Sequence, residues 1–411
     1  MIYQYAHPEF FKDWESPDLK AWDGKIILYG AGRRGSVAAH CLKKKNIDFI
    51  CFCDSDEKKQ GISYCGHHVI APDELLRDYS EMAVIITTNH FYVIADELRG
   101  KGFQHVYSSV SLFLKIDFDG YDMYSTEYAI RNIDQYFYSF IQNDDTISYL
   151  PQVQIPVTMR CTLRCKECNS YIPYVRKAED FAEDEILSAI DKLLTAYNKI
   201  GNILLYGGEP LLYRSLHKLI QRFSDNPAIE KITIVTNGTI MPDEKQQTAM
   251  MNSKVLVRIS DYGKLSDKKD DLLLLLNKLG VQTELTDFKY WNRNPVVDVL
   301  NETEDQLKKK VKNCCVLANM ITLIQGKIFF CGFSAFYDYF KAVPDYGDNY
   351  VNLSETEERG KDLRNKIERV RRMGKDGLPK QACRFCKFNN FEDDLPVAEQ
   401  TDEYLEFKRV Y

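Results

Sequence analysis

Three cysteines with short spacing stand near the middle of the chain, in the segment MRCTLRCKECNSY. Cys161, Cys165 and Cys168 follow the pattern C-x3-C-x2-C. Three thiolates on one loop can bind three irons of a [4Fe-4S] cluster and leave the fourth iron open to a small molecule. A structural zinc site takes four ligands, usually from paired C-x2-C hooks, and the neighbouring sequence offers no fourth. The spacing therefore favours an iron–sulfur cluster with one open iron.

A second group of cysteines lies towards the other end of the sequence. Its members are Cys314, Cys315, Cys331, Cys383 and Cys386. Four thiolates would satisfy either a zinc ion or a second [4Fe-4S] cluster. We expect one thiol of the adjacent pair to act as a ligand, and we favour Cys315.

The composition indicates where such thiols stay reduced. The chain has 411 residues and a formal net charge of −6, which argues against binding nucleic acid or anionic membranes through bulk charge. Its first residues lack a basic segment followed by an apolar one, and no apolar run approaches the roughly 18 residues of a membrane helix. We therefore expect a cytoplasmic protein with no membrane segment and no nucleic-acid partner, in which clustered cysteines bind metal.

A glycine motif follows the first cysteine group and identifies a resemblance. NILLYGGEPLLY predicts a buried strand that ends at Gly207, Gly208 and Glu209. Together with the cysteine loop, this motif resembles the radical S-adenosylmethionine (SAM) superfamily. The resemblance implies that the open iron chelates the amino and carboxylate groups of SAM, and that an electron from the cluster cleaves SAM to a 5′-deoxyadenosyl radical. It also implies that the strand edge and Glu209 bind the SAM amino group.

Elements with alternating β and α patterns must position these motifs. A strand over 153–160 precedes the cysteine loop, and a helix follows it, with Gly201 as the predicted stop. Further alternation predicts parallel strands with crossover helices, in a barrel or part of one.

Polar residues at strand C-terminal ends are typical of sites in such folds. By resemblance, Asn237, Ser260 and Asp261 are candidates for ribose and methionyl contacts, although Asn237 also fits an ordinary turn. Glu167 precedes Cys168, where the superfamily often has an aromatic residue, and this departure leaves the adenine position open. No catalytic residue is assigned.

The second cysteine group also resembles a known extension. Cys315, Gly326 and Cys331 match the opening of the SPASM and twitch extensions of radical SAM enzymes. The further cysteines of a full SPASM extension are missing, so the resemblance implies the shorter twitch form with one auxiliary [4Fe-4S] cluster. We favour iron–sulfur over zinc because the first motif makes cluster assembly expected.

The N-terminal segment carries a different glycine pattern. A strand over 26–29 runs into Gly30, Gly32 and Gly35, and a second strand ends at Asp54. This G-x-G-x-x-G setting predicts a small Rossmann-like sheet whose glycines let the backbone approach a phosphate. It also resembles Rossmann-like modules found beside sugar-modifying enzymes. Three roles stay open: binding a nicotinamide cofactor, binding a nucleotide or nucleotide-sugar, or a structural or docking role.

The predicted fold class is α/β, with a Rossmann-like parallel sheet, a partial (β/α)6 barrel and a twitch-type iron–sulfur domain. The predicted boundaries are 1–115 for the Rossmann-like domain, 116–150 for a helical connector, 151–310 for the barrel and 311–411 for the twitch-like domain. His67 and His68 are expected on a surface turn.

The predicted function is that of a radical SAM oxidoreductase. A fully ligated auxiliary cluster would move electrons, so the reaction is expected to be an oxidation or an epimerisation. The layout is similar to a twitch-type dehydrogenase that oxidises an aminocyclitol, which points to a carbohydrate-like substrate, free or nucleotide-activated. A reductase or a flavodoxin- or ferredoxin-type protein would donate electrons. The alternatives are a peptide-modifying maturase and a non-enzymatic iron–sulfur scaffold or sensor.

Overall fold

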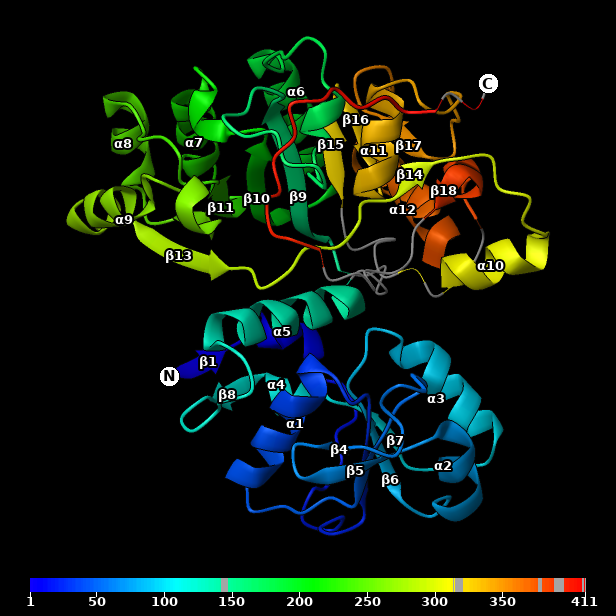
Figure 1. The fold of residues 1–411 in the computed structure, drawn as a ribbon. Helices are drawn as coiled ribbons and strands as arrows, with labels where there is room; N and C mark the ends of the chain where they lie inside the picture. Colours follow the sequence, from blue (N-terminus) through cyan, green and yellow to red (C-terminus); the bar gives the residue numbers. More distant parts are fainter. Residues whose placement is uncertain are drawn as a thin grey trace. The chain divides into compact units, whose positions relative to one another are not determined.

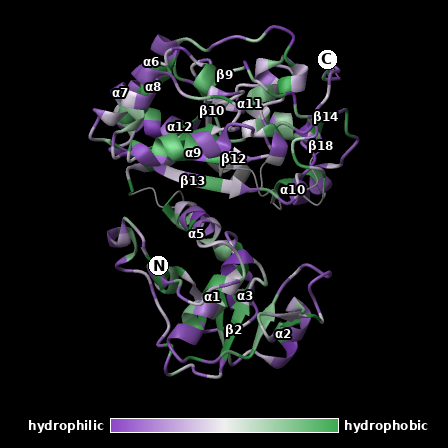
Figure 2. Cartoon of the chain, turned by 60° about the vertical axis from the view of Figure 1, so that its left-hand side comes forward, coloured by the Kyte–Doolittle hydropathy of each residue, from purple (hydrophilic) through white to green (hydrophobic). Residues whose placement is uncertain are grey.

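The structure, a computed structural model, describes residues 1–141, 147–312, 314, 321–375, 379–387, 395–408 and 410. The chain forms two compact units, Met1–Ile147 and Ser148–Tyr411 (Figure 1). Hydrophobic residues concentrate on the strands inside the units, and hydrophilic residues are frequent on the outer helices and loops (Figure 2).

The first unit is built around a sheet with the strand order β4-β5-β3-β2-β6-β7. The strands of this unit are β1 (Ile2–Gln4), β2 (Ile26–Tyr29), β3 (Cys51–Cys53), β4 (Ser63–Tyr64), β5 (His67–Ile70), β6 (Ala83–Ile86), β7 (Val106–Ser108) and β8 (Lys115–Asp117). Its helices are α1 (Arg33–Lys44), α2 (Pro72–Asp78), α3 (Phe91–Gly100), α4 (Val110–Phe113) and α5 (Thr126–Ile141). β2 pairs in parallel with β3 and β6, and all its residues are buried, as in a sheet covered on both faces.

Segment 116–150, predicted as a connector, contributes to the first unit. β8 pairs with β1 in antiparallel fashion. The hydroxyl of Tyr136, on α5, donates to the carbonyl of Ile86 at 3.0 Å. The Tyr3 hydroxyl donates to the carboxylate of Asp134, also on α5, at 2.7 Å. Helix α5 therefore packs into the core of the first unit.

The second unit contains an eight-stranded sheet in the order β13-β12-β11-β10-β9-β15-β16-β17. Its first five strands are β9 (Tyr149–Thr158), β10 (Lys199–Gly207), β11 (Ile229–Thr236), β12 (Val255–Asp261) and β13 (Gln282–Asp287). All neighbours among them are parallel. The connecting helices are α6 (Glu183–Ala196), α7 (Leu216–Ser224), α8 (Glu244–Met250) and α9 (Lys269–Lys278). The predicted α/β class is confirmed.

The sheet takes further strands from beyond residue 310. β15 (Thr322–Ile324) lies beside β9 as a sixth parallel strand, and β16 (Lys327–Phe329) and β17 (Tyr350–Asn352) follow in antiparallel order. The segment predicted as the twitch-like domain thus belongs to the same compact unit as the barrel strands. The other helices and strands of the second unit are β14 (Val296–Val297), α10 (Glu304–Lys312), α11 (Gly332–Tyr339), α12 (Gly360–Lys375) and β18 (Cys386–Lys387).

Gly201 does not end a helix, so that prediction was wrong. α6 ends at Ala196, and Gly201 lies inside β10. A Cβ at this position would lie 2.0 Å from the Tyr149 hydroxyl oxygen and 2.8 Å from the Pro151 carbonyl oxygen. The glycine is needed because the neighbouring strand β9 approaches closely, which is one of the reasons for glycine inside strands.

We expect Gly201→Ala to lower the free energy of unfolding by about 1–3 kcal/mol, because β9 must shift to admit the methyl group. Denaturant unfolding of the purified protein measures the change. Gly347→Ala is the matched control, since a Cβ there meets nothing within 4 Å. Equal stability of the two variants would contradict the close approach.

Candidate functional site

The loop that carries the first three cysteines begins directly after β9. Cys165 is 5% exposed, and Cys161 and Cys168 pack against the core of the second unit. Burial raises the pKa of each thiol, that of Cys165 to about 12. The charges of these cysteines also act on one another, since Cys168 raises the pKa of both Cys161 and Cys165. The structure therefore brings the three thiols together in a water-poor pocket.

The sulfur atoms of Cys161 and Cys165 accept N–H hydrogen bonds. Cys161 Sγ accepts from the Leu163 backbone at 3.4 Å, and Asn237 Nδ2 lies at 3.6 Å. Cys165 Sγ accepts from the side-chain amide of Gln400 at 3.1 Å. Burial raises the pKa of Cys168, and backbone N–H groups of the following turn act to lower it. Hydrogen bonds to the charged form favour a thiolate over a thiol, so the donors suit sulfurs that bind a positively charged group.

A cavity of about 350 Å³ opens beside these thiols. The loop contributes the three cysteines together with Glu167, and the carboxyl ends of β10, β11 and β12 contribute Gly207, Gly208, Asn237 and Ser260. Parallel strands bring their carboxyl ends to one edge of a sheet, which is why residues more than 90 positions apart meet here. The volume lies at the lower end of the range for small-molecule sites.

The two glycines let β10 end against the cysteine loop. Gly207 has φ +138°, and a Cβ on Gly208 would lie 2.0 Å from the Arg160 carbonyl oxygen. The Gly208 N–H donates to the Thr158 carbonyl at 2.8 Å, and the Glu209 N–H donates to that of Arg160 at 2.8 Å. The loop is thus fixed to the strand end by backbone contacts that a side chain would block.

Glu209 lies beneath the cavity rather than in its wall. Its side chain is fully buried, and it is not among the described residues that line the cavity. Its carboxylate accepts the N–H of Leu211 at 3.0 Å and that of Asn237 at 2.8 Å. Burial raises the pKa of Glu209 to about 7, although these hydrogen bonds act to lower it. The carboxylate therefore ties the end of β10 to the end of β11.

The remaining polar candidates differ in their surroundings. Asn237 and Ser260 line the cavity. Asp261 is not among the described residues that line the cavity. Its carboxylate contacts Lys269 Nζ at 2.5 Å and accepts the Gly263 N–H at 2.8 Å. Burial raises the pKa of Asp261, but the contacts with Lys269 and Gly263 outweigh it and the pKa is lowered. Arg258 is also outside the described lining, and its Nε donates to Glu284 at 3.0 Å.

Aromatic side chains form a wall of the cavity that the sequence analysis missed. They are Tyr206, Tyr262, Phe288, Tyr290 and Trp291. Tyr262 and Trp291 meet edge to face, with ring centroids 5.3 Å apart. Tyr262 follows Asp261 and Tyr206 precedes Gly207, so the strand-end argument could have found both. The other three gave no motif.

The contacts of Glu167 explain why a carboxylate stands before Cys168. Its carboxylate accepts the backbone N–H of Asn294 at 2.8 Å. Where the superfamily often has an aromatic residue, this chain has a carboxylate that anchors the segment after Trp291. The aromatic surface comes instead from that segment.

The later cysteines also lie near one another. The described members are Cys314, Cys331, Cys383 and Cys386; Cys315 lies outside the described residues. Burial, and after it the charge of Cys314, raises the pKa of Cys331 to about 11. Burial, and after it the charge of Cys331, raises the pKa of Cys383 to about 12. Cys386 lies on β18, which pairs with β14.

A buried cation accompanies this group. Lys380 is 2% exposed, and among the described residues its ammonium has no hydrogen-bond partner. It lies 4.9 Å from the centre of the Phe330 ring. Burial lowers the pKa of Lys380 to about 8, while the charges of Cys331, Cys383 and Asp348 act to raise it. A buried unpaired ammonium is costly, so an anionic centre of several thiolates fits this position.

Two tyrosines lie between the cysteine groups. The Tyr171 N–H donates to the Cys168 carbonyl at 2.8 Å. The hydroxyls of Tyr171 and Tyr337 both donate to the Pro295 carbonyl, at 2.8 and 3.0 Å. The Tyr337 hydroxyl is also 3.8 Å from the sulfur of Cys386. The chain thus connects the two groups through one buried pair of rings.

Across the described ranges, no His, Cys, Asp or Glu group of three or more converges as a single metal ion requires. In a cubane each cysteine binds a different iron, so its sulfurs need not converge on one point.

In the glycine loop of the first unit, the backbone and the Asp54 side chain contact each other. Gly30 has φ +118°, and a Cβ on Gly35 would lie 2.1 Å from the Gly30 carbonyl oxygen. The Asp54 carboxylate accepts the Ala31 N–H at 2.8 Å and contacts Lys59 Nζ at 3.3 Å. The acidic residue that a dinucleotide site would direct at a ribose here stabilises the loop itself.

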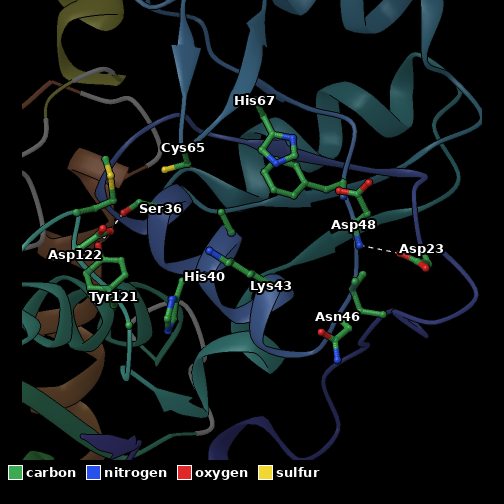
Figure 3. A pocket seen from close by; sticks show the side chains of 15 residues that line it. Asp23, Ser36, His40, Lys43, Asn46, Asp48, Cys65, His67, Tyr121 and Asp122 are labelled. Carbon is green, nitrogen blue, oxygen red and sulfur yellow. Dashed lines mark hydrogen bonds between the residues drawn. The ribbon is translucent and has the colours of Figure 1, made fainter.

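A cavity of about 590 Å³ in the first unit lies away from this loop (Figure 3). Ser36, His40 and Lys43 of α1 face it from one side, and His67 lies across from them. The His67 ring stacks on Phe49 with centroids 3.8 Å apart. His67 and His68 begin β5, so the prediction of a turn was wrong, whereas the predicted exposure holds for His68. The ligand of the first unit stays open.

Comparison with known proteins identifies the second unit. Residues 155–258 match the family model of the radical SAM superfamily, and residues 22–101 match a family described as C2185-like, N-terminal. The chain therefore contains a radical SAM domain, as predicted. Such a domain implies a [4Fe-4S] cluster and SAM as cofactors, which confirms that prediction.

Curated relatives match over part of the chain. A GTP 3′,8-cyclase of Staphylococcus carnosus is 32% identical over 102 residues, which cover 23% of this chain and 29% of the relative. A GTP 3′,8-cyclase of Clostridium perfringens is 29% identical over 139 residues, 33% of this chain and 39% of the relative. This chain thus spans less than two fifths of the length of these relatives.

Solved structures resemble the chain at low identity. The structure of anSMEcpe with bound AdoMet gives a TM-score of 0.36 at 15% identity, covering 64% of this chain and 93% of that one. The structure of BtrN in complex with AdoMet and 2-DOIA gives 0.35 at 16% identity, covering 63% and 98%. No helix in the described ranges combines the length and the apolar character that a membrane crossing requires.

Glu209→Gln tests the buried carboxylate. Because its folded-state pKa is raised to about 7, the unfolded chain releases this proton first, and the wild type loses stability as the pH rises from about 4.5 to 7. The variant replaces one acceptor by a donor and should be destabilised by about 1–3 kcal/mol near pH 5. This difference should shrink towards pH 8, because the wild type alone carries the cost of the buried charge.

Denaturant unfolding of the cluster-free protein at several pH values measures the difference. Glu244→Gln, at an exposed position, is the control and should show no such trend. A difference for Glu209→Gln that stays constant across this range would contradict the raised pKa.

Proposed function

We propose that Cys161, Cys165 and Cys168 hold the [4Fe-4S] cluster of the radical SAM domain and that SAM occupies the adjoining cavity. The burial of the three thiols, their N–H donors and their place in the cavity wall support this assignment. When bound, the cluster and SAM supply a 5′-deoxyadenosyl radical that removes a hydrogen atom from a substrate.

The chain's own residues would bind and orient SAM. The open backbone edge at Gly207 and Gly208 would receive its amino group, and Asn237 and Ser260 would contact the ribose and methionyl groups. Glu209 and Asp261 would position these residues rather than contact SAM, because their carboxylates are occupied by the contacts described above. Tyr262 and Trp291 offer rings on which an adenine can stack.

We further propose that Cys331, Cys383, Cys386 and one thiol of the pair Cys314 and Cys315 hold an auxiliary [4Fe-4S] cluster. The orphaned ammonium of Lys380 supports an anionic centre there. Iron–sulfur is preferred to zinc because the radical SAM domain already requires cluster assembly. A cluster with four protein ligands supplies an electron acceptor and leaves no iron free for substrate.

The reaction that this arrangement supports best is the two-electron oxidation of a carbohydrate-like alcohol, free or nucleotide-activated. The carbon of the alcohol would lose its hydrogen atom to the radical that SAM supplies, and the hydroxyl proton would go to solvent. The auxiliary centre would take up the remaining electron, which leaves a ketone. The observation that carries this proposal is the buried link through Tyr171 and Tyr337 between the two cysteine groups. A small reductase or flavodoxin-type protein would reduce the first cluster.

The proposal is tested by incubating reduced, reconstituted protein with SAM and a panel of nucleotide-sugars. We expect 5′-deoxyadenosine to form in step with a ketone product, measured by mass spectrometry. A variant with Cys161, Cys165 and Cys168 changed to Ala is the control: it should form no 5′-deoxyadenosine and lose about four of about eight irons. If GTP or a peptide alone triggers SAM cleavage, the carbohydrate proposal is wrong.

Lys380→Met tests the auxiliary centre, because it keeps the apolar stem and removes the ammonium. In cluster-free protein the variant should unfold at a higher temperature, since the wild type buries an unpaired charge. In cluster-loaded protein it should unfold at a lower temperature than the wild type, because the anionic centre loses its counter-charge. Lys361→Met, at an exposed position, is the control. A shift in the same direction in both states would contradict the pairing.

A further inference from the structure

A segment close to the end of the chain lies along the first cysteine loop. We name residues 395–408 the C-terminal strap; it appears in red in Figure 1. The Lys166 N–H donates to the Glu399 carbonyl at 2.8 Å, and the Thr401 N–H donates to the Arg164 carbonyl at 2.9 Å. Strap and loop therefore pair like two short antiparallel strands around Cys165.

Both ends of the strap are anchored to other parts of the site. At one end, Leu395 and Trp291 exchange two backbone hydrogen bonds, of 2.7 and 2.8 Å, beside the aromatic wall. At the other end, the Phe407 ring stacks on Tyr174 with centroids 4.2 Å apart. The strap is therefore held in place independently of its contacts with the cysteine loop.

The side chain of Gln400 points its amide at Cys165. Gln400 Oε1 accepts the Arg164 backbone N–H at 2.8 Å. Because this contact fixes the oxygen, the amide nitrogen faces the other way and donates to Cys165 Sγ at 3.1 Å. The nitrogen also donates to the Ala398 carbonyl at 2.6 Å. The orientation of the amide is thus determined on both of its ends.

We propose that Gln400 is a positioning residue that raises the reduction potential of the first cluster by donating a hydrogen bond to Cys165 Sγ. The inference rests on the proposed function, in which Cys165 is a cluster ligand. Hydrogen bonds to the sulfurs are among the factors that set cluster potentials. Reduction adds negative charge to the cluster and its sulfurs, and an N–H directed at one of them stabilises the reduced form more than the oxidised form.

The donor comes from outside the radical SAM match. The donors to Cys161 come from Leu163 and from Asn237, both within residues 155–258. Gln400 is separated from Cys165 by 235 positions. The potential of the first cluster would therefore depend on a segment outside residues 155–258, which match the family model.

Two substitutions separate the hydrogen bond from the strap itself. Gln400→Met keeps the length of the side chain and removes the donor. Gln400→Glu keeps the acceptor for the Arg164 N–H, and hence the pairing of the strap, but directs a carboxylate oxygen at the sulfur. Glu399→Gln is the matched control, since it changes the neighbouring strap residue and breaks its ion pair with Lys166 without touching sulfur.

The measurement is a redox titration of the full-length, reconstituted protein followed by EPR, with the first cluster identified as the signal that changes on adding SAM. At a fixed potential, the ratio of reduced to oxidised cluster should fall about tenfold in Gln400→Met, equivalent to about 59 mV for one electron. It should fall further in Gln400→Glu, which adds a negative charge. Glu399→Gln removes a negative charge and frees Lys166, so its potential should stay at or above the wild-type value.

Each failure has its own signature. If both Gln400 variants titrate like the wild type, or if Glu399→Gln lowers the potential as far as they do, the role of Gln400 is wrong while the cluster assignment stands. If the wild type shows no SAM-sensitive cluster that depends on Cys161, Cys165 and Cys168, the proposed function itself is wrong. Retention of iron in Gln400→Glu, together with a lowered potential, supports the hydrogen bond over a merely structural role.

Discussion

The buried carboxylate of Glu209 is the interaction on which the geometry of the site depends. It accepts backbone N–H groups from Leu211 and Asn237, so it joins the ends of two parallel strands that would otherwise expose unpaired donors. Asn237, held in this way, donates to Thr162 at 3.1 Å in the cysteine loop. The absence of a Cβ on Gly208 lets the same loop lie against β10. A carboxyl group without solvent access thus organises a cavity that it does not line.

The parts of the site that the sequence predicted are those in which local spacing carries the chemistry. The three cysteines and the two glycines occur in short motifs, and Ser260 ends a strand that its own pattern reveals. Gly201 shows the limit of such reasoning. A glycine is required there because the Tyr149 hydroxyl on the neighbouring strand leaves no room for a Cβ. Gln400 gave no signal for the same reason, because its partner Cys165 is distant in sequence and meets it only in the folded unit. Lys380 lies three positions before Cys383, but its burial beside Cys331 appears only in the folded unit.

The first unit separates fold from ligand in a similar way. Its glycine pattern predicted the parallel sheet, because Gly30 and Gly35 are needed for the close turn between β2 and α1. The same pattern did not predict a ligand, since Asp54 accepts a hydrogen bond from the loop that it follows. The cavity lies instead on another side of α1, where His67, Lys43 and Tyr121 have no motif in common (Figure 3). A glycine pattern of this kind therefore predicts how the backbone packs, and it does not by itself predict a ligand.

In the proposed function the two cysteine groups hold clusters, and the charges around the two groups differ. This difference would give electron transfer a direction. Near the first group, Arg160 pairs with Asp180 and Lys166 pairs with Glu399, so these cations are already neutralised, and the described donors to its sulfurs are neutral N–H groups. The second group has a buried ammonium, Lys380, without a carboxylate partner among the described hydrogen bonds. A full charge at low dielectric stabilises added negative charge more than amide dipoles do. An electron released by an oxidised substrate is therefore expected to favour the second centre over the first.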